Sequence, residues 1–550
     1  MALYVGFDVS TQSLTAVVIE IVGATRRVVH EDALTYDEEL PHYGTRHGVL
    51  PDPDPRVGVS PPLMWAEALD RVMARLAASG LDLSRIDAIS GAGQQHGSVY
   101  LSPAGDATLA RLDPVRPLTA QLRDAFSREV SPIWMDTTTA EECAEITARI
   151  GGEETLARHT GSRAFERFTG PQIRRFAKRA PGDYEKTSHI HLVSSFMASL
   201  LAGVSAPLEP GDASGMNLMD LRTRDWWAPA LDATAPGLAA KLPPIVAPWS
   251  RVGALAPYWQ SRYGFPPASV IAWTGDNPSS LVGTGLVAEG RLAISLGTSD
   301  TVFAPMATPE VEASGTGHVF GAPTGAFMGL TCFQNGSLAR EQVRADLGLS
   351  WPEFSCALAE LPPGSGGRVM LPWFSPEITP AVSVPGVRRY GAPPSGASDV
   401  RAVVEGQMLS MALHSRWMAP RIDTIHATGG AAVNRDVLQV MADVFGADVY
   451  QLRVGHSAAL GAALRAAHAR RRDRDRSTSW DDVVAGLAEP DAGSRIAARR
   501  DRHAFYRDML EIHAACEAHA LGRGPDPALC SIALPPGRCR VRLQPRDLTR

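Results

Sequence analysis

The stretch LYVGFDVSTQSLTAVVI, residues 3–19, decides the fold of this chain. It predicts two short strands joined by a tight turn of small hydroxyl residues, with Asp8 at the end of the first strand. Such a turn can point backbone N–H groups at a phosphate while the carboxylate faces a hydrated cation. A related stretch, LAISLGTSDTVF, occurs at residues 292–303. Two related hairpins, each opening one half of the chain, suggest a duplicated domain that clamps a nucleotide between its halves.

Length and composition indicate a globular protein of two large domains. The chain has 550 residues, which is too long for one hydrophobic core. We place the domain boundary near residue 283, which gives domains of residues 1–283 and 284–521. The tail, residues 522–550, has no helical period and is expected to be an appendage or disordered. The net charge of −6 argues against nucleic acid as the main partner.

Cysteine usage and the N-terminus favour a cytoplasmic protein. The six cysteines are scattered, without a Cys-x-x-Cys pair or a zinc spacing, as is typical of a reduced compartment. The N-terminus lacks the basic and then apolar layout of a signal peptide. No stretch reaches the roughly 18 apolar residues of a membrane span. We therefore expect no membrane partner.

Two loops at the ends of predicted strands carry polar side chains. The strand at residues 86–89 runs into a glycine-rich loop, residues 91–97, that contains His96. The strand at residues 269–272 runs into a loop that contains Asp276 and Asn277. Ligands of parallel sheets usually bind at such strand ends.

A third strand end carries a pair of glycines. The strand at residues 422–427 leads into Gly429 and Gly430, and a helix with Gly446 as its stop follows. The two glycines let a flat group approach the backbone closely, so adenosine and its first phosphates at this helix N-terminus would explain both. The alternative is a plain tight turn. A Walker P-loop is excluded because no Gly-x-x-x-x-Gly-Lys-Ser/Thr motif occurs in the chain.

Asp8 and Asp276 are the carboxylates best placed for chemistry. Phosphoryl transfer to a sugar hydroxyl needs a metal on the phosphates and a carboxylate that takes the hydroxyl proton. Asp8 suits the metal, through waters, and Asp276 suits the base. The structural alternatives are a turn-capping aspartate for Asp8 and a helix N-cap for Asp276. His96 can hydrogen-bond a polyol or be a structural histidine, and Arg167 can bind sugar hydroxyls or pair with a surface acid.

These motifs together resemble the FGGY carbohydrate kinases, within the actin-like ATPase superfamily, over about residues 3–520. The resemblance is greatest to xylulokinases of the eukaryotic type. It rests on the two hairpins and on SGAGQQHGS (90–98), WMD (134–136), TGSRAFERFTG (160–170), DASGMNL (212–218), GDN (275–277), NGSL (335–338) and PEITP (376–380).

The resemblance implies an α/β fold of two actin-like, ribonuclease H-like ATPase domains with an interdomain cleft. It also implies an enzyme, a monomer or homodimer, that uses ATP and Mg²⁺ to convert D-xylulose to D-xylulose 5-phosphate. Asp276 would be the catalytic base, and Asp8 would organise the magnesium. The ketopentose would be held by Asp276, Asn277, His96 and Arg167. The phosphates would be lined by Thr11, Gln12, Gly297, Thr298 and Ser299, and the adenosine would be held by Gly429, Gly430 and Asn434, with Trp351 beside the adenine.

Other functions remain open from the sequence. The chain departs from the family where Thr137 follows the WMD motif in place of a frequent arginine, and the later motif is blurred around residues 386–391. The same chemistry on ribulose, gluconate or erythritol is one alternative. A sugar or nucleotide sensor without catalysis is another. A nucleotide-gated protein like actin or a heat-shock chaperone is a third, and the intact Gly-Asp-Asn loop argues against it.

Overall fold

A computed structural model describes residues 2–23, 25–312, 315, 317–365, 367–391, 396, 398–452 and 455–527. The chain divides into two compact units that are each discontinuous in sequence. The first unit contains Met1–Val287, Met306–Met328 and Val454–Glu489, and the second contains Ala288–Pro305, Gly329–Arg453 and Pro490–Arg550. Most of the predicted tail, from residue 528 on, lies outside the described residues. The domain boundary at residue 283 stays a prediction.

The first unit is built on a mixed sheet in which a hairpin joins parallel strands. Strand β1 pairs antiparallel with β2 and parallel with β5, and β5 pairs parallel with β12 and β13. The strand order is β11-β12-β5-β1-β2-β3, with β13 beside β5. The bounds are β1 (Ala2–Val9), β2 (Ser13–Val22), β3 (Thr25–Thr35), β5 (Ile86–Gly93), β11 (Arg251–Ala254), β12 (Ser269–Ile271) and β13 (Thr274–Gly275).

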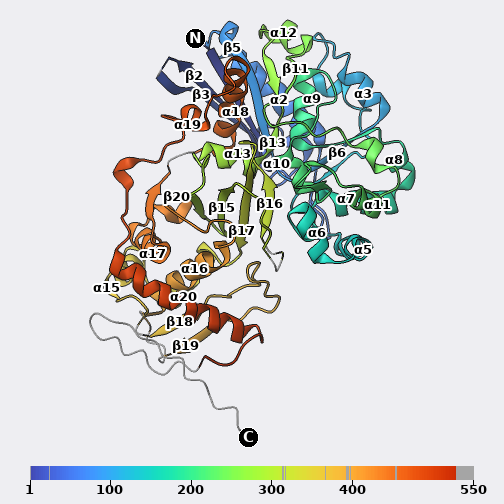
Figure 1. The fold of residues 1–550 in the computed structure, drawn as a ribbon. Coiled ribbons are helices and arrows are strands. Elements are labelled where there is room, and N and C mark those ends of the chain that lie inside the picture. The colour runs from blue at the N-terminus through green and yellow to red at the C-terminus, as the bar shows by residue number, and fades with distance from the viewer. Residues whose placement is uncertain are drawn as a thin grey trace. The chain divides into compact units, whose positions relative to one another are not determined.

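Alternation along β1 gives this sheet two hydrophobic faces. The odd-numbered residues of β1, such as Val5 and Phe7, join the core that includes residues of helices α2 (Pro62–Ala78) and α9 (Val193–Ala202). On the other face, Tyr4 packs with residues of helix α18 (Ser457–Arg474). Helix α18 lies next to β5 in Figure 1. A side chain at Gly6 would overlap the backbone of this helix, so glycine is required for the close contact.

The predicted glycine-rich loop at residues 91–97 begins later than expected. Gly91 and Gly93 belong to β5. Both are needed for close packing, since Gly91 packs against the indole of Trp273 and Gly93 packs against the N-terminus of α9. The loop itself starts at Gln94. The predicted loop at Asp276 is likewise shorter, since Asp276 is the first residue of helix α13 (Asp276–Gly283).

The second unit repeats the same arrangement of strands. The hairpin of β14 (Arg291–Leu296) and β15 (Asp300–Met306) is antiparallel, β14 pairs parallel with β20 (Thr424–Thr428), and β20 pairs parallel with β21 (Asp448–Gln451). The α-helices in the described part of this unit, several of which Figure 1 labels, are α14 (Ser337–Asp346), α15 (Trp351–Glu360), α16 (Ser398–Ser415), α17 (Arg435–Phe445) and α20 (Arg500–Ala520).

The sequence of residues 384–396 predicts a loop, but part of this segment of the second unit is a strand. Residues 388–391 form strand β19 (Arg388–Gly391), which pairs antiparallel with β18 (Arg368–Leu371). Its sequence, Arg-Arg-Tyr-Gly, has no alternation of apolar residues, so only the pairing with β18 defines it. Residues 392–395 of the same predicted loop lie outside the described residues.

The predicted fold class is confirmed. Both units are α/β, and each places an antiparallel hairpin beside two parallel strands, as the two related sequence stretches indicated. Among the described residues, no helix has both the length and the hydrophobicity needed to cross a bilayer.

Candidate active site

The carboxyl ends of the parallel strands in the first unit bring the predicted carboxylates together. Asp8 lies near the end of β1, and Asp276 follows β13. Both line one cavity of about 420 Å³. The rest of its lining is mostly small and polar: Ser10, Ser13, Thr15, Ala33, Thr35, Asn277, Ser280, Gly455, His456, Ser457 and Ala458.

Only one of the two carboxylate oxygens of Asp8 has a hydrogen-bond partner among the described residues. Its Oδ2 accepts a hydrogen bond from the Ser10 hydroxyl at 2.7 Å, and its buried Oδ1 has no partner among the described residues. Burial and then the nearby charge of Asp276 raise the pKa of Asp8 to about 7. A cation at this carboxylate would relieve both effects. The oxygen-rich lining therefore fits Mg²⁺, which favours one or two carboxylates and keeps several waters.

Asp276 is partly buried at the start of α13. Its carboxylate accepts hydrogen bonds from the backbone and side-chain amides of Asn277, at 2.8 and 3.1 Å. The Asn277 side chain also donates to Gln95 Oε1 at 3.0 Å, which ties this helix to the loop after β5. Burial raises the pKa of Asp276 to about 6, and hydrogen bonds from the backbone of Asn277 and Gln95 limit the rise. Asp276 is thus mostly ionised at neutral pH and close to the range of an efficient general base.

His96 follows Gln95 and is held in a left-handed backbone conformation, with φ of 73°. Its Nδ1 lies 2.7 Å from the carbonyl oxygen of Gly215. Because a carbonyl only accepts, Nδ1 carries the proton, and Nε2 is left as an acceptor in the neutral ring. Burial and then the charge of Arg167 lower the pKa of His96 to about 3, so the ring is neutral across the physiological range.

Arg167 and His96 are connected by aromatic rings that pack against both side chains. Its guanidinium lies over Phe165 and Phe168, 5.1 and 5.8 Å from the ring centroids. The His96 ring packs against Phe168 at 4.4 Å between centroids. The Arg167 guanidinium also donates to Nε2 of His318 at 2.9 Å. The sequence did not single out His318, which comes from a distant segment of the first unit.

Next to Asp276 lies a cluster of buried ionisable side chains, Glu209, Asp212 and Arg465, that sequence reasoning also missed. Glu209 and Asp212 are buried, and burial raises the pKa of both. The Asp212 carboxylate accepts from the Ser194 hydroxyl, and Glu209 accepts from the Thr274 hydroxyl. Arg465, on the adjacent helix α18, donates to backbone carbonyls at the ends of β5 and β12, at 3.2 and 2.6 Å. These contacts fix the strand ends that carry the candidate residues.

The turn of the first hairpin is only partly available to a ligand. The Thr11 hydroxyl accepts from the Trp134 indole at 2.9 Å and donates to Gln94 at 3.3 Å. Gln12 is exposed, and its backbone carbonyl accepts from Tyr36 N. Thus Gln12, more than Thr11, has a side chain that can reach a phosphate.

In the second unit, the residues predicted to bind phosphate and the glycines predicted to bind adenosine lie at adjacent strand ends. Gly297, Thr298 and Ser299 form the turn between β14 and β15. Gly429 follows β20, which is the parallel neighbour of β14. Gly429 has φ of 90° and closely approaches the backbone of Leu296, so glycine is required there.

Asn434 and Trp351 belong to neighbouring helices of this unit. Asn434 caps α17 by accepting from the backbone N–H groups of Asp436 and Val437, at 3.0 and 3.2 Å. It also donates to the Ser355 hydroxyl of α15 at 2.7 Å. Trp351, the first residue of α15, is 44% exposed. A Cβ added at Gly430 would meet nothing within 4 Å, so the backbone there is open to a ligand.

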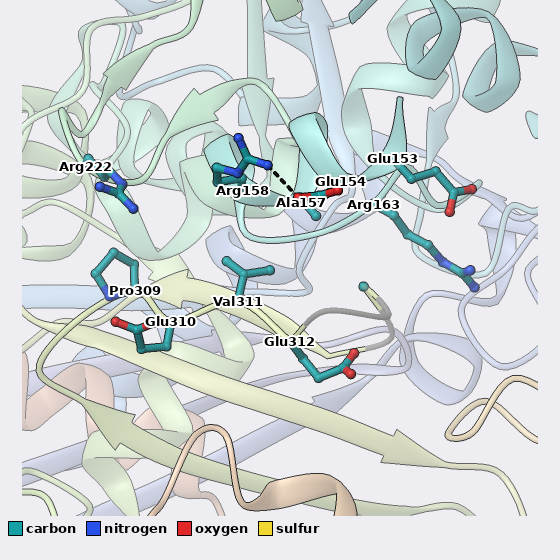
Figure 2. Close-up of a pocket in the computed structure, with 11 residues that line it drawn as sticks. Glu153, Glu154, Ala157, Arg158, Arg163, Arg222, Pro309, Glu310, Val311 and Glu312 are labelled. Atoms are coloured by element: carbon teal, nitrogen blue, oxygen red, sulfur yellow. Dashed lines mark hydrogen bonds and ion pairs between the residues drawn. The ribbon is translucent and has the colours of Figure 1, made fainter. Parts of the chain in front are cut away.

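A larger hollow of about 720 Å³ in the first unit contains none of these residues. It lies between helix α6 (Glu153–Thr160) and the segment 309–312, and Gly315 also lines it (Figure 2). Its charges are mixed, and Arg158 is already paired with Glu154 at 2.6 Å. The side chains of Arg222 and Arg163 lie toward opposite ends of the view and do not converge. Size alone therefore does not mark the site, and the cavity at Asp8 and Asp276 is the better candidate.

Comparison with known proteins places the chain in a family. Residues 124–283 match the N-terminal domain of the FGGY family of carbohydrate kinases, and residues 292–470 match its C-terminal domain. A xylulose kinase of Rattus norvegicus is 43% identical over 476 residues, which cover 84% of this chain and 87% of the rat protein. The chain belongs to the FGGY family of carbohydrate kinases, as the resemblance predicted.

Solved structures agree with this fold. A ligand-bound xylulose kinase from Lactobacillus acidophilus superposes with a TM-score of 0.77 at 18% identity, covering 95% of this chain and 99% of the other. A gluconate kinase from the same organism gives a TM-score of 0.78 at 18% identity, covering 94% and 98%. The fold therefore does not distinguish the two sugars.

Proposed function

We propose that this protein transfers the terminal phosphoryl group of ATP to the C5 hydroxyl of D-xylulose, forming D-xylulose 5-phosphate and ADP. The observation that carries the proposal is the 43% identity, over 84% of the chain, to a protein that is named a xylulose kinase. The arrangement of polar groups in the first unit supports it independently.

The candidate sugar residues offer both donors and acceptors, as a polyol requires. Arg167 only donates, while His96 Nε2 and the carboxylate of Asp276 accept. Asn277 holds Asp276 and is itself held by Gln95, at 3.0 Å. A ketopentose has a carbonyl that accepts from an arginine and hydroxyls that donate to the imidazole and the carboxylate. An analogue that lacks one of these groups would leave a buried partner unsatisfied, which typically costs about 1–3 kcal/mol.

Asp276 acts as the general base in this proposal. It accepts the proton of the attacking hydroxyl as the oxygen approaches the γ-phosphorus. Its hydrogen bonds to Asn277 orient the carboxylate, so little reorganisation is needed when the proton moves.

Asp8 would hold Mg²⁺ through water, with Ser10 orienting one carboxylate oxygen. When bound, the metal neutralises charge on the ATP phosphates. The site fits the metal because Asp8 has an oxygen without a partner and a raised pKa, both of which a cation would correct.

The second unit would hold the nucleotide. The turn at residues 297–299 would bind the phosphates through backbone N–H groups. Gly430, where an added Cβ would meet nothing within 4 Å, permits close approach of the ribose and α-phosphate, and Gly429 lies beside it. Trp351 is 44% exposed and offers an aromatic ring for adenine, and Asn434 caps helix α17 next to it.

A coupled ADP-release assay tests the proposal with a panel of D-xylulose, D-ribulose, D-gluconate, erythritol and glycerol. We expect kcat/KM for D-xylulose to exceed that of each other acceptor by at least about tenfold, the value of one lost buried hydrogen bond. A higher value for another member of the panel would move the assignment to that sugar. If none of the acceptors increased the release of ADP, a kinase function for this chain would be contradicted.

A further inference from the structure

A buried histidine contacts Arg167 from a part of the sequence that no motif marks. His318 is the first residue of strand β16 (His318–Gly321) and is 1% exposed. Its Nε2 lies 2.9 Å from Nη2 of Arg167, and its Nδ1 lies 3.0 Å from the Ser162 hydroxyl. Both ring nitrogens are therefore engaged.

The partners of His318 fix its protonation state. A guanidinium nitrogen can only donate, so Nε2 of His318 must present its lone pair to Arg167. The proton then lies on Nδ1, which donates to the Ser162 oxygen. Burial, followed by the charge of Arg167, lowers the pKa of His318 well below its ordinary range. Arg163 and His96 also face this ring, and neither favours a second proton.

The same ring supports both candidate sugar residues. His318 packs edge-on against Phe165 at 4.9 Å between centroids and beside Phe168 at 5.6 Å. These are the rings under the Arg167 guanidinium, and Phe168 also packs against His96. A charged, five-donor group over aromatic faces has several orientations of similar energy. A fixed acceptor at one nitrogen selects one of them.

We propose that His318 is a positioning residue for sugar binding: its Nε2 accepts from Arg167 and holds the guanidinium in the orientation that meets the sugar. This inference rests on the proposed function, in which Arg167 binds the ketopentose. Ser162 supports this arrangement, because its hydroxyl accepts the Nδ1 proton of His318.

A matched pair of variants isolates the acceptor. In His318→Gln the side-chain amide reaches the position of Nε2 and can still accept from Arg167. In His318→Asn the amide reaches only the position of Nδ1, near Ser162. Both lose the aromatic ring, so their common loss of packing cancels in the comparison.

We expect His318→Asn to raise the KM for D-xylulose about tenfold, as for one lost charge-assisted hydrogen bond, and His318→Gln to raise it less than about threefold. The KM for ATP should stay the same in both. In an Arg167→Ala background the two variants should have the same KM for D-xylulose, because the acceptor then has nothing to hold.

Equal sugar KM values for the two variants, or a difference that persists in the Arg167→Ala background, would overturn the inference. An unchanged sugar KM in Arg167→Ala alone would also overturn it, while activity on D-xylulose would leave the proposed function intact. If neither His318 variant folds, Ser162→Ala provides the test: it removes the acceptor that anchors Nδ1 of the ring, and should raise the sugar KM severalfold without changing the KM for ATP. An unchanged sugar KM in that variant would overturn the inference.

Discussion

Replacing Asp8 by Asn should make the ligand-free protein more stable at pH 8 while it loses the metal-binding carboxylate. Burial and the charge of Asp276 raise the pKa of Asp8 from 3.8 to about 7. Below about pH 4 the carboxyl is protonated in both the folded and the unfolded state. As the pH rises from 4 to 7, the unfolded chain ionises first, so the raised pKa lowers the free energy of unfolding throughout this window.

The size of the effect follows from the two pKa values. The difference between 3.8 and about 7, at about 1.4 kcal/mol per pKa unit, corresponds to about 4 kcal/mol. This is an upper bound because Asp8 lines a cavity open to water. Asn carries no charge, so the variant should unfold at a temperature higher by up to roughly 5 °C. The gap between the variant and the wild type should narrow as the pH falls from 8 to 5.

Differential scanning fluorimetry in EDTA measures this gap, and Asp37→Asn is the matched control. Although burial raises the pKa of Asp37, hydrogen bonds from Thr45, Gly48 and His47 lower it overall. Asn at that position should therefore lower the midpoint at pH 8. Added Mg²⁺ should raise the midpoint of the wild type and not of Asp8→Asn. An Asp8→Asn midpoint at or below that of the wild type at pH 8 would refute the reasoning.

Asp276→Asn should lower kcat by about 10²–10⁴-fold with the fold intact by circular dichroism, and a variant above about a tenth of the wild-type rate would contradict its role as the base. Because burial raises the pKa of Asp276 to about 6, kcat/KM of the wild type should fall as the pH drops through about 6, and a flat profile from pH 5 to 8 would argue against an Asp276 base. His96→Ala should raise the KM for D-xylulose and leave the KM for ATP unchanged, since His96 lies in the first unit. A raised KM for ATP with an unchanged KM for D-xylulose in steady-state kinetics would show that the assignment of His96 to the sugar is wrong. Asn434→Ala should cost about 1 kcal/mol in urea unfolding through the lost helix cap, and should raise the KM for ATP; an unchanged ATP KM would remove Asn434 from the nucleotide site. The two units should close on substrates by bending near residues 281–291, and an unchanged radius of gyration at saturation with sugar and a non-hydrolysable ATP analogue would count against closure.

Strand ends were the most predictable part of the site. Apolar runs show where β1 and the strands before Asp276 stop, and parallel pairing then brings their carboxyl ends to one edge. Asp8 and Asp276 line one cavity of the first unit. The functional roles of these two residues stay predictions.

Glycines were harder to interpret because sequence does not distinguish flexibility from close packing. Gly91 and Gly93 resemble a ligand loop, but they make room for an indole and a helix. Gly283, within the predicted hinge, allows helix α13 to contact the backbone of α18 at Ser457. Gly285 and Gly290 have φ of 73° and 84°. The backbone flexibility proposed for the hinge at residues 281–291 is therefore expected mainly at these two glycines.

Long-range contacts could not be predicted from local pattern. His318 follows Arg167 by 151 positions, and nothing in its neighbourhood marks it as a partner. Arg465 lies in a helix rich in arginine and would be assigned to the surface, yet it is 2% exposed and bonds the ends of β5 and β12. In both cases the tertiary fold creates the environment that gives the residue its role.

The most direct test of the central claim is the identity of the product formed from ATP, Mg²⁺ and D-xylulose. ³¹P and ¹³C nuclear magnetic resonance of the reaction mixture would show which oxygen carries the phosphoryl group. We predict D-xylulose 5-phosphate, formed in a one-to-one ratio with ADP and absent from the Asp276→Asn reaction over the same time. ADP without a sugar phosphate, or a phosphate on another oxygen of the sugar, would contradict the account.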